Sequence, residues 1–168
     1  MRAREEREFR EFVAVRMAVL RRFAYLLCGD PHGADDIVST TLAKLFRHWR
    51  RVSRLDHPDG YLRRMLVSSY LDERRRPWRR ERPTDAVPEP PPVPATDVVE
   101  RLTLMRLLDR LSPRRRAVLV LRFYADLSVE QTADVLGCAP GTVKALTHQA
   151  LAQLRTLLAE PESIMEES

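Results

Sequence analysis

Five positions near the C-terminus, between residues 142 and 149, combine contact chemistry for DNA with the spacing of a single helix face. Lys144 could take a guanine edge and Gln149 an adenine, while Thr142 or His148 could hydrogen-bond a phosphate. Ala145 completes the outward face of the same helix. Because an α-helix fits the major groove, this pattern predicts a helix that lies in the groove with these side chains towards the bases.

The stretch that must position this helix, residues 127–158, predicts two helices joined by a tight turn. Ser128 and Gln131 have the spacing of a capping box, and Gly137 supplies the left-handed residue that ends the first helix. Pro140 suits the first turn of the second helix. Residues with helical spacing are expected to bury its other face: Val143, Leu146, Ala150, Leu154 and Leu157. This order of signals favours a DNA-binding helix-turn-helix over an ordinary helical hairpin.

Composition limits the remaining possibilities. The 168 residues are 44% hydrophobic and 32% charged, which is typical of one medium or two small globular domains. No apolar run is long enough to cross a bilayer and the first residues lack a signal-peptide core, so we expect a cytoplasmic protein with no membrane contact. Cys28 and Cys138 have no metal-ligand spacing, which predicts free thiols, no metal site and no cofactor.

Positive charge is concentrated in the first half of the chain. Residues 1–82 carry 20 Lys and Arg against 12 Asp and Glu, whereas residues 101–168 carry nine against eight. Within the basic half, Tyr61, Tyr70 and Trp78 are interleaved with arginines. This pattern suits a track for a DNA backbone with stacking platforms for unpaired bases, but a solvated arginine-rich face explains it equally well.

Helical signals cover both halves of the chain. Three helices are expected in the first half, over residues 5–27, from Asp30 to about residue 49, and from about 58 to 76. Residues 83–96 hold six prolines in fourteen positions and form a linker. Helical spacing resumes at residue 97, and Ser112 caps a further helix with Phe123 among the residues expected to pack inward. The predicted fold is all-α.

The expected domain boundaries follow from these segments. Two small helical domains, residues 1–82 and 97–160, are joined by the Pro-rich linker 83–96, and the second contains the helix-turn-helix over residues 128–158. Residues 161–168 form a short acidic tail.

Three segments, in this order and spacing, resemble the extracytoplasmic-function (group 4, sigma-70 family) sigma factors of bacterial RNA polymerase, in particular the sigma-E-like, actinobacterial-type subgroup. They are YLLCGDPHGADDIVSTTLAKLFRHW, GYLRRMLVSSYLDERRR and LSPRRRAVLVLRFYADLSVEQTADVLGCAPGTVKALTHQALAQLR. The resemblance implies a protein that binds core RNA polymerase and promoter DNA to initiate transcription. An anti-sigma factor is a further candidate partner.

The resemblance also implies three contact surfaces. Core polymerase would contact the second helix at Asp36, Ser39, Thr40, Leu45 and Phe46. The minus-10 element would contact the loop over residues 51–59 and the following helix at Tyr61, Arg63, Arg64, Ser68, Arg74 and Arg75. The minus-35 element would contact Thr142, Lys144, Ala145, His148 and Gln149.

The chain departs from the family pattern at several of these positions. Ser68 stands where the family usually has Asn, Ala145 and Leu146 replace Ser-Arg, and Gln149 replaces an Arg. Since each good pair of base contacts contributes about 1–3 kcal/mol of discrimination, we expect a relaxed or unusual minus-35 preference.

Two other functions fit parts of the sequence. A stand-alone transcription regulator could bind operators as a homodimer through the same helix-turn-helix. An enzyme acting on nucleic acid would need a Gly-rich phosphate loop, a Cys/His couple or paired catalytic carboxylates, and the sequence has none of these motifs. We therefore expect a protein that is not an enzyme.

Overall fold

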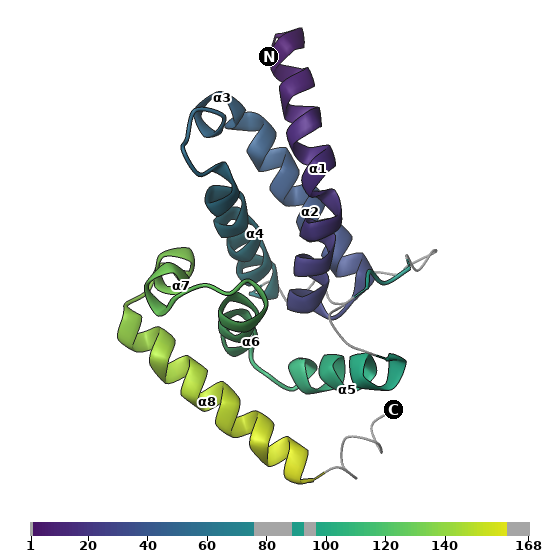
Figure 1. The fold of residues 1–168 in the computed structure, drawn as a ribbon, viewed down its shortest axis with the longest axis vertical. Helices are drawn as coiled ribbons and strands as arrows, with labels where there is room; N and C mark the ends of the chain where they lie inside the picture. The colour runs from purple at the N-terminus through teal and green to yellow at the C-terminus, as the bar shows by residue number, and fades with distance from the viewer. Residues whose placement is uncertain (1, 76–88, 93–96, 161–168) are drawn as a thin grey trace. The chain divides into compact units, whose positions relative to one another are not determined.

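The computed structural model describes residues 2–75, 89–92 and 97–160, and every regular element in these ranges is a helix (Figure 1). The chain divides into two compact units, residues 1–92 and 93–168. The prediction of an all-α chain with two small helical domains is confirmed.

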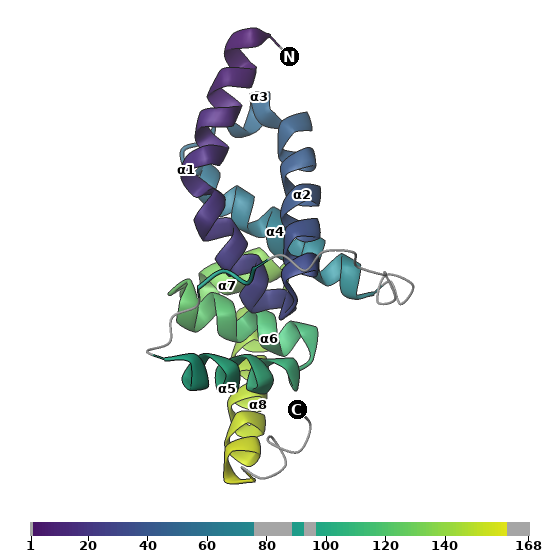
Figure 2. The ribbon, with the colours of Figure 1, turned by 90° about the vertical axis from the view of Figure 1, so that its right-hand side faces the viewer.

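The described residues of the first unit form four helices. They are α1 (Ala3–Cys28), α2 (Pro31–Arg47), the short α3 (Trp49–Val52) and α4 (Pro58–Arg74). Helix α2 packs against both α1 and α4, and Figure 2 shows α1 and α2 side by side. Three long helices thus enclose one apolar core, with α3 and an exposed loop between α2 and α4.

The break between α1 and α2 follows the sequence signals. Gly29 has φ 74°, and its N–H donates to the carbonyl of Tyr25, which ends α1. The Asp30 carboxylate then accepts hydrogen bonds from the N–H groups of His32 and Gly33 at the start of α2. The hydrogen bonds that end α1 and begin α2 form between residues close in the sequence, so the sequence alone was sufficient to predict where the chain turns.

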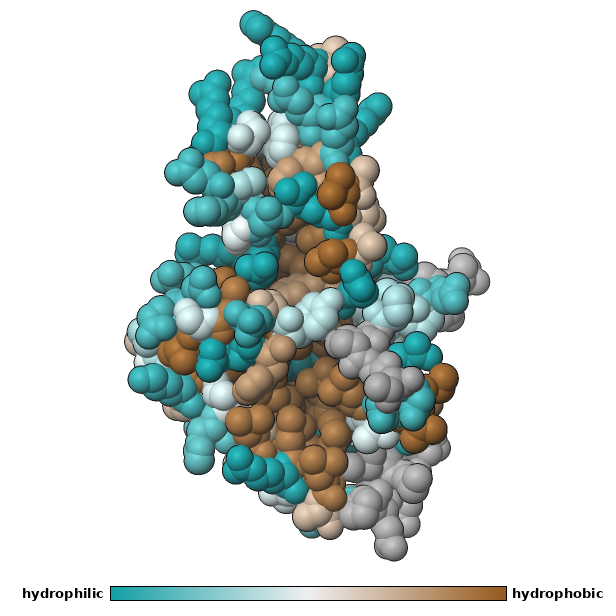
Figure 3. Space-filling view, in the orientation of Figure 1, coloured by the Kyte–Doolittle hydropathy of each residue, from teal (hydrophilic) through white to brown (hydrophobic). Residues whose placement is uncertain are grey.

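Aromatic rings join α1 to the end of α2 and to α3. Phe9 meets Phe46 and Trp49 edge-on, with ring centroids 5.2 and 5.5 Å apart, and Phe12 lies 5.0 Å from Trp49. On the face shown in Figure 3, most of the surface at this end of the first unit is hydrophilic. The remainder of the core is mainly aliphatic. Its residues with at most 2% exposure include Leu27, Ile37, Leu45, Val52, Leu66 and Val67, together with the aromatic ring of Tyr70.

The second unit contains α5 (Val98–Asp109), α6 (Pro113–Leu119), a π-helical turn η2 (Val120–Tyr124), α7 (Val129–Leu136) and α8 (Pro140–Ala159). Helix α8 packs against α6 and α7. Val118, Ala133 and Val143, one residue from each of these helices, form the centre of the core. The unit is therefore a helix-turn-helix supported by α6.

Phe123 corrects the sequence prediction. It was expected to pack inward, but it is 61% exposed. The chain widens into a π-turn here, because the N–H of Ala125 donates to the carbonyl of Val120, five residues back, at 3.0 Å. This change of period rotates Phe123 out of the apolar stripe.

Helix α5 is buried only along its second half. Val98 and Leu102 have helical spacing with Met105, but they are 58% and 51% exposed, whereas Met105 and Leu108 are buried. On the face shown in Figure 3, apolar surface gathers over the part of the second unit between α5 and the C-terminal half of α8.

No helix among the described residues is long and apolar enough to span a membrane. Both cysteines are free, with Cys28 buried and Cys138 half-buried.

Candidate nucleic-acid interface

The outward face of α8 has the geometry that the sequence predicted. Every one of the five expected contact residues is exposed: Thr142, Lys144, Ala145, His148 and Gln149. On the opposite face Val143 and Ala150 are fully buried. Helix α8 is thus packed on the core along one face, and its opposite face is exposed to solvent.

Local hydrogen bonds set the turn before α8. The Ser128 N–H donates to Gln131 Oε1 at 2.9 Å, and the Gln131 N–H donates to Ser128 Oγ at 3.0 Å, so the predicted capping box starts α7. Gly137, with φ 66°, ends α7, and Pro140 is in the first turn of α8. An L-residue at Gly137 would be strained at this φ, which accounts for the glycine.

Gln149 does not stand alone on this face. Its Oε1 accepts a hydrogen bond from Arg115 Nη2 at 3.3 Å, and Arg115 Nη1 donates to Gln153 Oε1 at 3.0 Å. Sequence reasoning missed Arg115, because the run from Arg114 to Arg116 was counted only as charge. The usable signal was the helical spacing of Gln149 and Gln153, four residues apart.

The loop over residues 53–57, between α3 and α4, is exposed along its whole length. Two contacts hold its ends. Arg51 Nη2 donates to Tyr61 Oη at 2.5 Å, with the guanidinium 5.5 Å from the ring centroid. Arg16 of α1 donates to both carboxylate oxygens of Asp59, at 2.5 and 3.2 Å. The hydrogen bond from Arg16, together with the positive charges of Arg16 and Arg63, lowers the pKa of Asp59.

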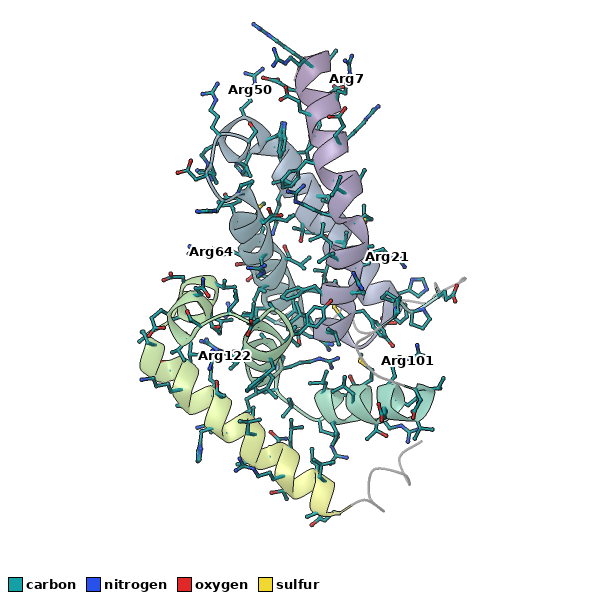
Figure 4. The ribbon with its side chains drawn as sticks, in the orientation of Figure 1. Arg7, Arg21, Arg50, Arg64, Arg101 and Arg122 are labelled. Carbon is teal, nitrogen blue, oxygen red and sulfur yellow. The ribbon has the colours of Figure 1, made fainter. Side chains whose placement is uncertain are left out.

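Four of the residues expected to contact the minus-10 element lie on the accessible side of α4. Arg64, Ser68 and Arg75 are exposed, and Arg63 is half-buried. Figure 4 labels Arg64 among the arginines of this unit. Tyr61 is half-buried, and its hydroxyl accepts a hydrogen bond from Arg51. Its side chain therefore lies at the base of the loop.

Two expectations for α4 need correction. Tyr70 is 1% exposed, so it is a core residue and cannot offer a stacking surface to a base. Arg74 stacks on the Tyr70 ring at 5.6 Å and donates to the carbonyl of Cys28 at 2.8 Å, which ties α4 to the end of α1. Arg76 and Trp78 lie outside the described residues.

A basic hollow at the junction of α2 and α3 was not anticipated. It is lined by Phe46, Arg47, His48, Arg50 and Arg51. Arg50 reaches Glu5 of α1 at 3.1 Å. The pKa of Glu5 is lowered, first by the backbone N–H of Arg2 and then by Arg50. In the described part of the chain Arg47 is exposed and forms no ion pair, so its charge is available.

The outer face of α2 carries four of the five residues expected to contact core polymerase. Ser39 and Phe46 are exposed, and Asp36 and Thr40 are half-buried. Leu45 is the exception, because it has no exposed surface and lies in the core of the unit. Packing of α2 against α1 and α4 puts Leu45 on the buried side of the helix, whereas Phe46 is 40% exposed.

These surfaces carry side chains that suit binding. Among residues 2–75, 89–92 and 97–160, no three His, Cys, Asp or Glu side chains gather closely enough to hold a metal ion. The surfaces consist of arginine, small polar and apolar side chains, which suit contacts with nucleic acid and protein.

Comparison with known families gives two matches in chain order. A family model described as sigma-70 region 2 matches residues 13–80, and one described as sigma-70 region 4 matches residues 101–154. The first covers most of α1 to α4 and the second covers α5 to most of α8.

Similar proteins include an RNA polymerase sigma-E factor of Streptomyces coelicolor, 39% identical over 88% of this chain and 84% of the relative. An ECF RNA polymerase sigma factor SigL of Mycobacterium tuberculosis is 34% identical over 85% of this chain and 84% of its own length. Both relatives align with most of the chain.

Solved structures agree on the fold. The sigma factor RpoE of Bartonella quintana, solved with the anti-sigma factor NepR, has a TM-score of 0.70 and 23% identity over 90% of this chain and 97% of that one. CnrH, solved with the cytosolic domain of CnrY, has a TM-score of 0.62 and 24% identity over 92% and 90%.

Proposed function

The chain belongs to the extracytoplasmic-function sigma factors of the sigma-70 family, and we propose that its two units divide promoter recognition between them. As a sigma factor it binds core RNA polymerase and directs it to promoters. The observation that carries this conclusion is the pair of family matches, one on each unit, together with relatives aligned over most of the chain.

The outer face of α2 is the proposed contact for core polymerase. Asp36, Ser39, Thr40 and Phe46 supply one charge, two hydroxyls and an aromatic ring 40% exposed. An exposed aromatic side chain that becomes buried on binding, with polar groups around it, is typical of a protein interface. Leu45 supports this face from the core.

The loop over residues 53–57 and the accessible side of α4 are the proposed minus-10 site. The loop is fully exposed between anchored ends, which lets it enclose an unpaired base. In this proposal Arg63, Arg64 and Arg75 neutralise phosphates of the opened strand, which their exposed or half-buried side chains support, and Ser68 stands at the usual Asn position. Arg47, in the adjoining hollow, extends the same basic surface.

The outward face of α8 is the proposed minus-35 site. Lys144 is placed for a base edge near the helix start, with Thr142 and His148 for phosphates. Ala145 offers only a methyl group, so few direct base contacts are available. A relaxed minus-35 preference remains our prediction.

Run-off transcription with purified core polymerase on genomic fragments tests the proposal. Arg64→Ala should reduce promoter opening broadly, and Lys144→Ala should change which sequences are chosen. Arg10→Ala and Arg101→Ala make the same charge change on α1 and α5 and serve as controls. Start sites that do not depend on the added chain, or identical transcripts from all four variants, would contradict the assignment.

A homodimeric operator-binding regulator is not favoured, because the region 2 match accounts for a whole unit that such a regulator does not need. We propose that the chain works in the cytoplasm without catalysing a reaction of its own. An anti-sigma factor is the expected inhibitor, since the structural neighbour RpoE of Bartonella quintana was solved with the anti-sigma factor NepR. Loss of core binding when a candidate anti-sigma factor is co-expressed with the chain would support this partner.

A further inference from the structure

The guanidinium of Arg115, in the first turn of α6, is held by two side-chain amides of α8. Nη1 donates to Gln153 Oε1 at 3.0 Å and Nη2 donates to Gln149 Oε1 at 3.3 Å. Gln153 is fixed in turn, because its Nε2 donates to the carbonyl of Arg110 at 2.9 Å. Three hydrogen bonds therefore set the position of the Arg115 side chain, although long arginine side chains on surfaces are usually free to rotate.

The charge of Arg115 is oriented without being neutralised. It forms no ion pair with a carboxylate in the described part of the chain. The next residue shows the contrast: Arg116 is 3% exposed and pairs with Asp109 at 2.6 Å, as a structural arginine does. A guanidinium has five N–H donors, so two neutral acceptors leave Arg115 three donors and its full charge for an anion.

Arg115 also lies at the edge of the face that is proposed to enter the groove. Gln149 is exposed one turn after Ala145, and Arg115 is half-buried beside it on the neighbouring helix. In helix-turn-helix complexes, side chains beside the recognition helix contact the sugar-phosphate backbone and fix its register.

We propose that Arg115 binds a DNA phosphate at the edge of the minus-35 duplex, and that Gln149 and Gln153 are the positioning residues that aim it. This inference rests on the proposed minus-35 role of α8. Bidentate readout of adenine by Gln149 would use its Oε1 for the adenine amino group, and one of the two lone pairs of that oxygen already accepts from Arg115. We therefore assign Gln149 to positioning Arg115, a role that adds affinity without selecting a base, in place of the adenine contact expected from the sequence.

Promoter binding by the full chain with core polymerase, measured across a range of salt concentrations, tests this role. Each phosphate contact contributes about 0.9 to the slope of log affinity against log salt. Arg115→Ala should lower the slope by that amount, so the advantage of the wild type should shrink about 3.5-fold between about 50 and about 200 mM salt. The loss should be equal on fragments that differ at single minus-35 positions.

The remaining variants separate positioning from structure. Gln149→Ala should weaken binding equally on all fragments, whereas Arg115→Lys should keep the wild-type salt slope with lower affinity. Arg101→Ala, on α5, should leave the slope unchanged. If Arg115→Ala does not fold, Arg115→Gln keeps much of the stem and the hydrogen bonding, and it should show the same slope change.

Two results would overturn the inference while the proposed function stands: a wild-type slope in the neutral Arg115 variants, or a changed adenine preference in Gln149→Ala. A wild-type chain that never binds core polymerase or a promoter would overturn both.

Discussion

The two units hold their proposed DNA-binding surfaces in different ways. In the first unit, ion pairs fix the ends of the contact region, with Arg16 on Asp59 and Arg50 on Glu5. In the second unit, neutral groups do the same work, through the Ser128–Gln131 capping box and the glutamines that hold Arg115. Ion pairs therefore hold the first surface, whereas at the second surface neutral groups hold Arg115 and leave its charge available.

This difference changes what net charge means for DNA binding. Residues 1–82 carry the basic excess, but several of their arginines are already committed to carboxylates, a tyrosine or a backbone carbonyl. Residues 101–168 are nearly neutral, yet Arg115 is oriented and forms no ion pair within the described residues. The local partners of each arginine, more than the total, decide how many phosphates a surface can neutralise.

The largest effect should come from the core of the first unit. The ion pairs of Arg16 and Arg50 hold only the proposed DNA-binding surface. The free energy that holds the helices of this unit together should therefore come from apolar packing. Leu45→Ala should therefore cost about 2–5 kcal/mol of unfolding free energy, because Leu45 is fully buried. Tryptophan fluorescence during denaturation reports this unit, since both tryptophans lie within residues 1–92.

Phe46→Ala is the matched control on the same helix. Phe46 is 40% exposed, so its removal should destabilise the unit less while weakening core-polymerase binding more. Equal losses of stability from the two variants, or weaker polymerase binding only with Leu45→Ala, would contradict this assignment. Leu45 would then be a contact residue for core polymerase.

A smaller effect is expected at the start of α7. Ser128→Ala removes the side chain that accepts the Gln131 N–H, and it should cost about 0.5–2 kcal/mol. Because the capping hydrogen bonds are uncharged, the loss should be the same at low and high salt. Amide hydrogen exchange over residues 129–136 measures it within the second unit.

Ser112→Ala tests whether this cost is general, since Ser112 caps α6 with one hydrogen bond, from the N–H of Arg115 at 3.3 Å. We expect a smaller loss there, because the Ser128 cap is reciprocal. If the loss of stability in either variant depended strongly on salt, charge would contribute to these helix caps. The second unit would then not differ from the first in how it is held.

Local signals in the sequence were enough for most of the fold. Gly29, Asp30, Ser128 and Gly137 each act through neighbouring backbone groups, so their positions set the helix ends in advance. The exposed face of α8 was predictable for the same reason. Phe123 was not, because a π-turn changes the helical period without a signal in residue type.

For the candidate sites, the sequence predicted which residues share a helix face, but it did not predict which of them are buried by packing against other helices. Leu45 and Tyr70 looked suitable by type and by resemblance, but packing of α2 against α1 and α4 buries both. Arg74 and Arg115 were misjudged or missed, because their partners, the Cys28 carbonyl and Gln149, are 46 and 34 residues away in the chain. Such partners follow from tertiary structure and have no local pattern.

The smallest effect should come from the ion pair at the base of the loop. Asp59→Asn should destabilise the first unit by about 0.2–1 kcal/mol, because the Asp59 side chain is 58% exposed and the pair is screened by solvent. The folded pKa of Asp59 is lowered by Arg16, so the pair stabilises the folded state fully above the unfolded pKa of about 4. That stability should disappear as pH falls through the folded pKa.

Wild type and Asp59→Asn should therefore differ in stability at neutral pH and converge in acid, and at neutral pH they should also converge at about 1 M salt. Asp56→Asn makes the same charge change in the exposed loop, where no ion pair forms within the described residues, and should show neither dependence. A difference at Asp59 that persists in acid and in high salt would mean that packing, and not charge, holds the loop. The first unit would then be built on the same principle as the second.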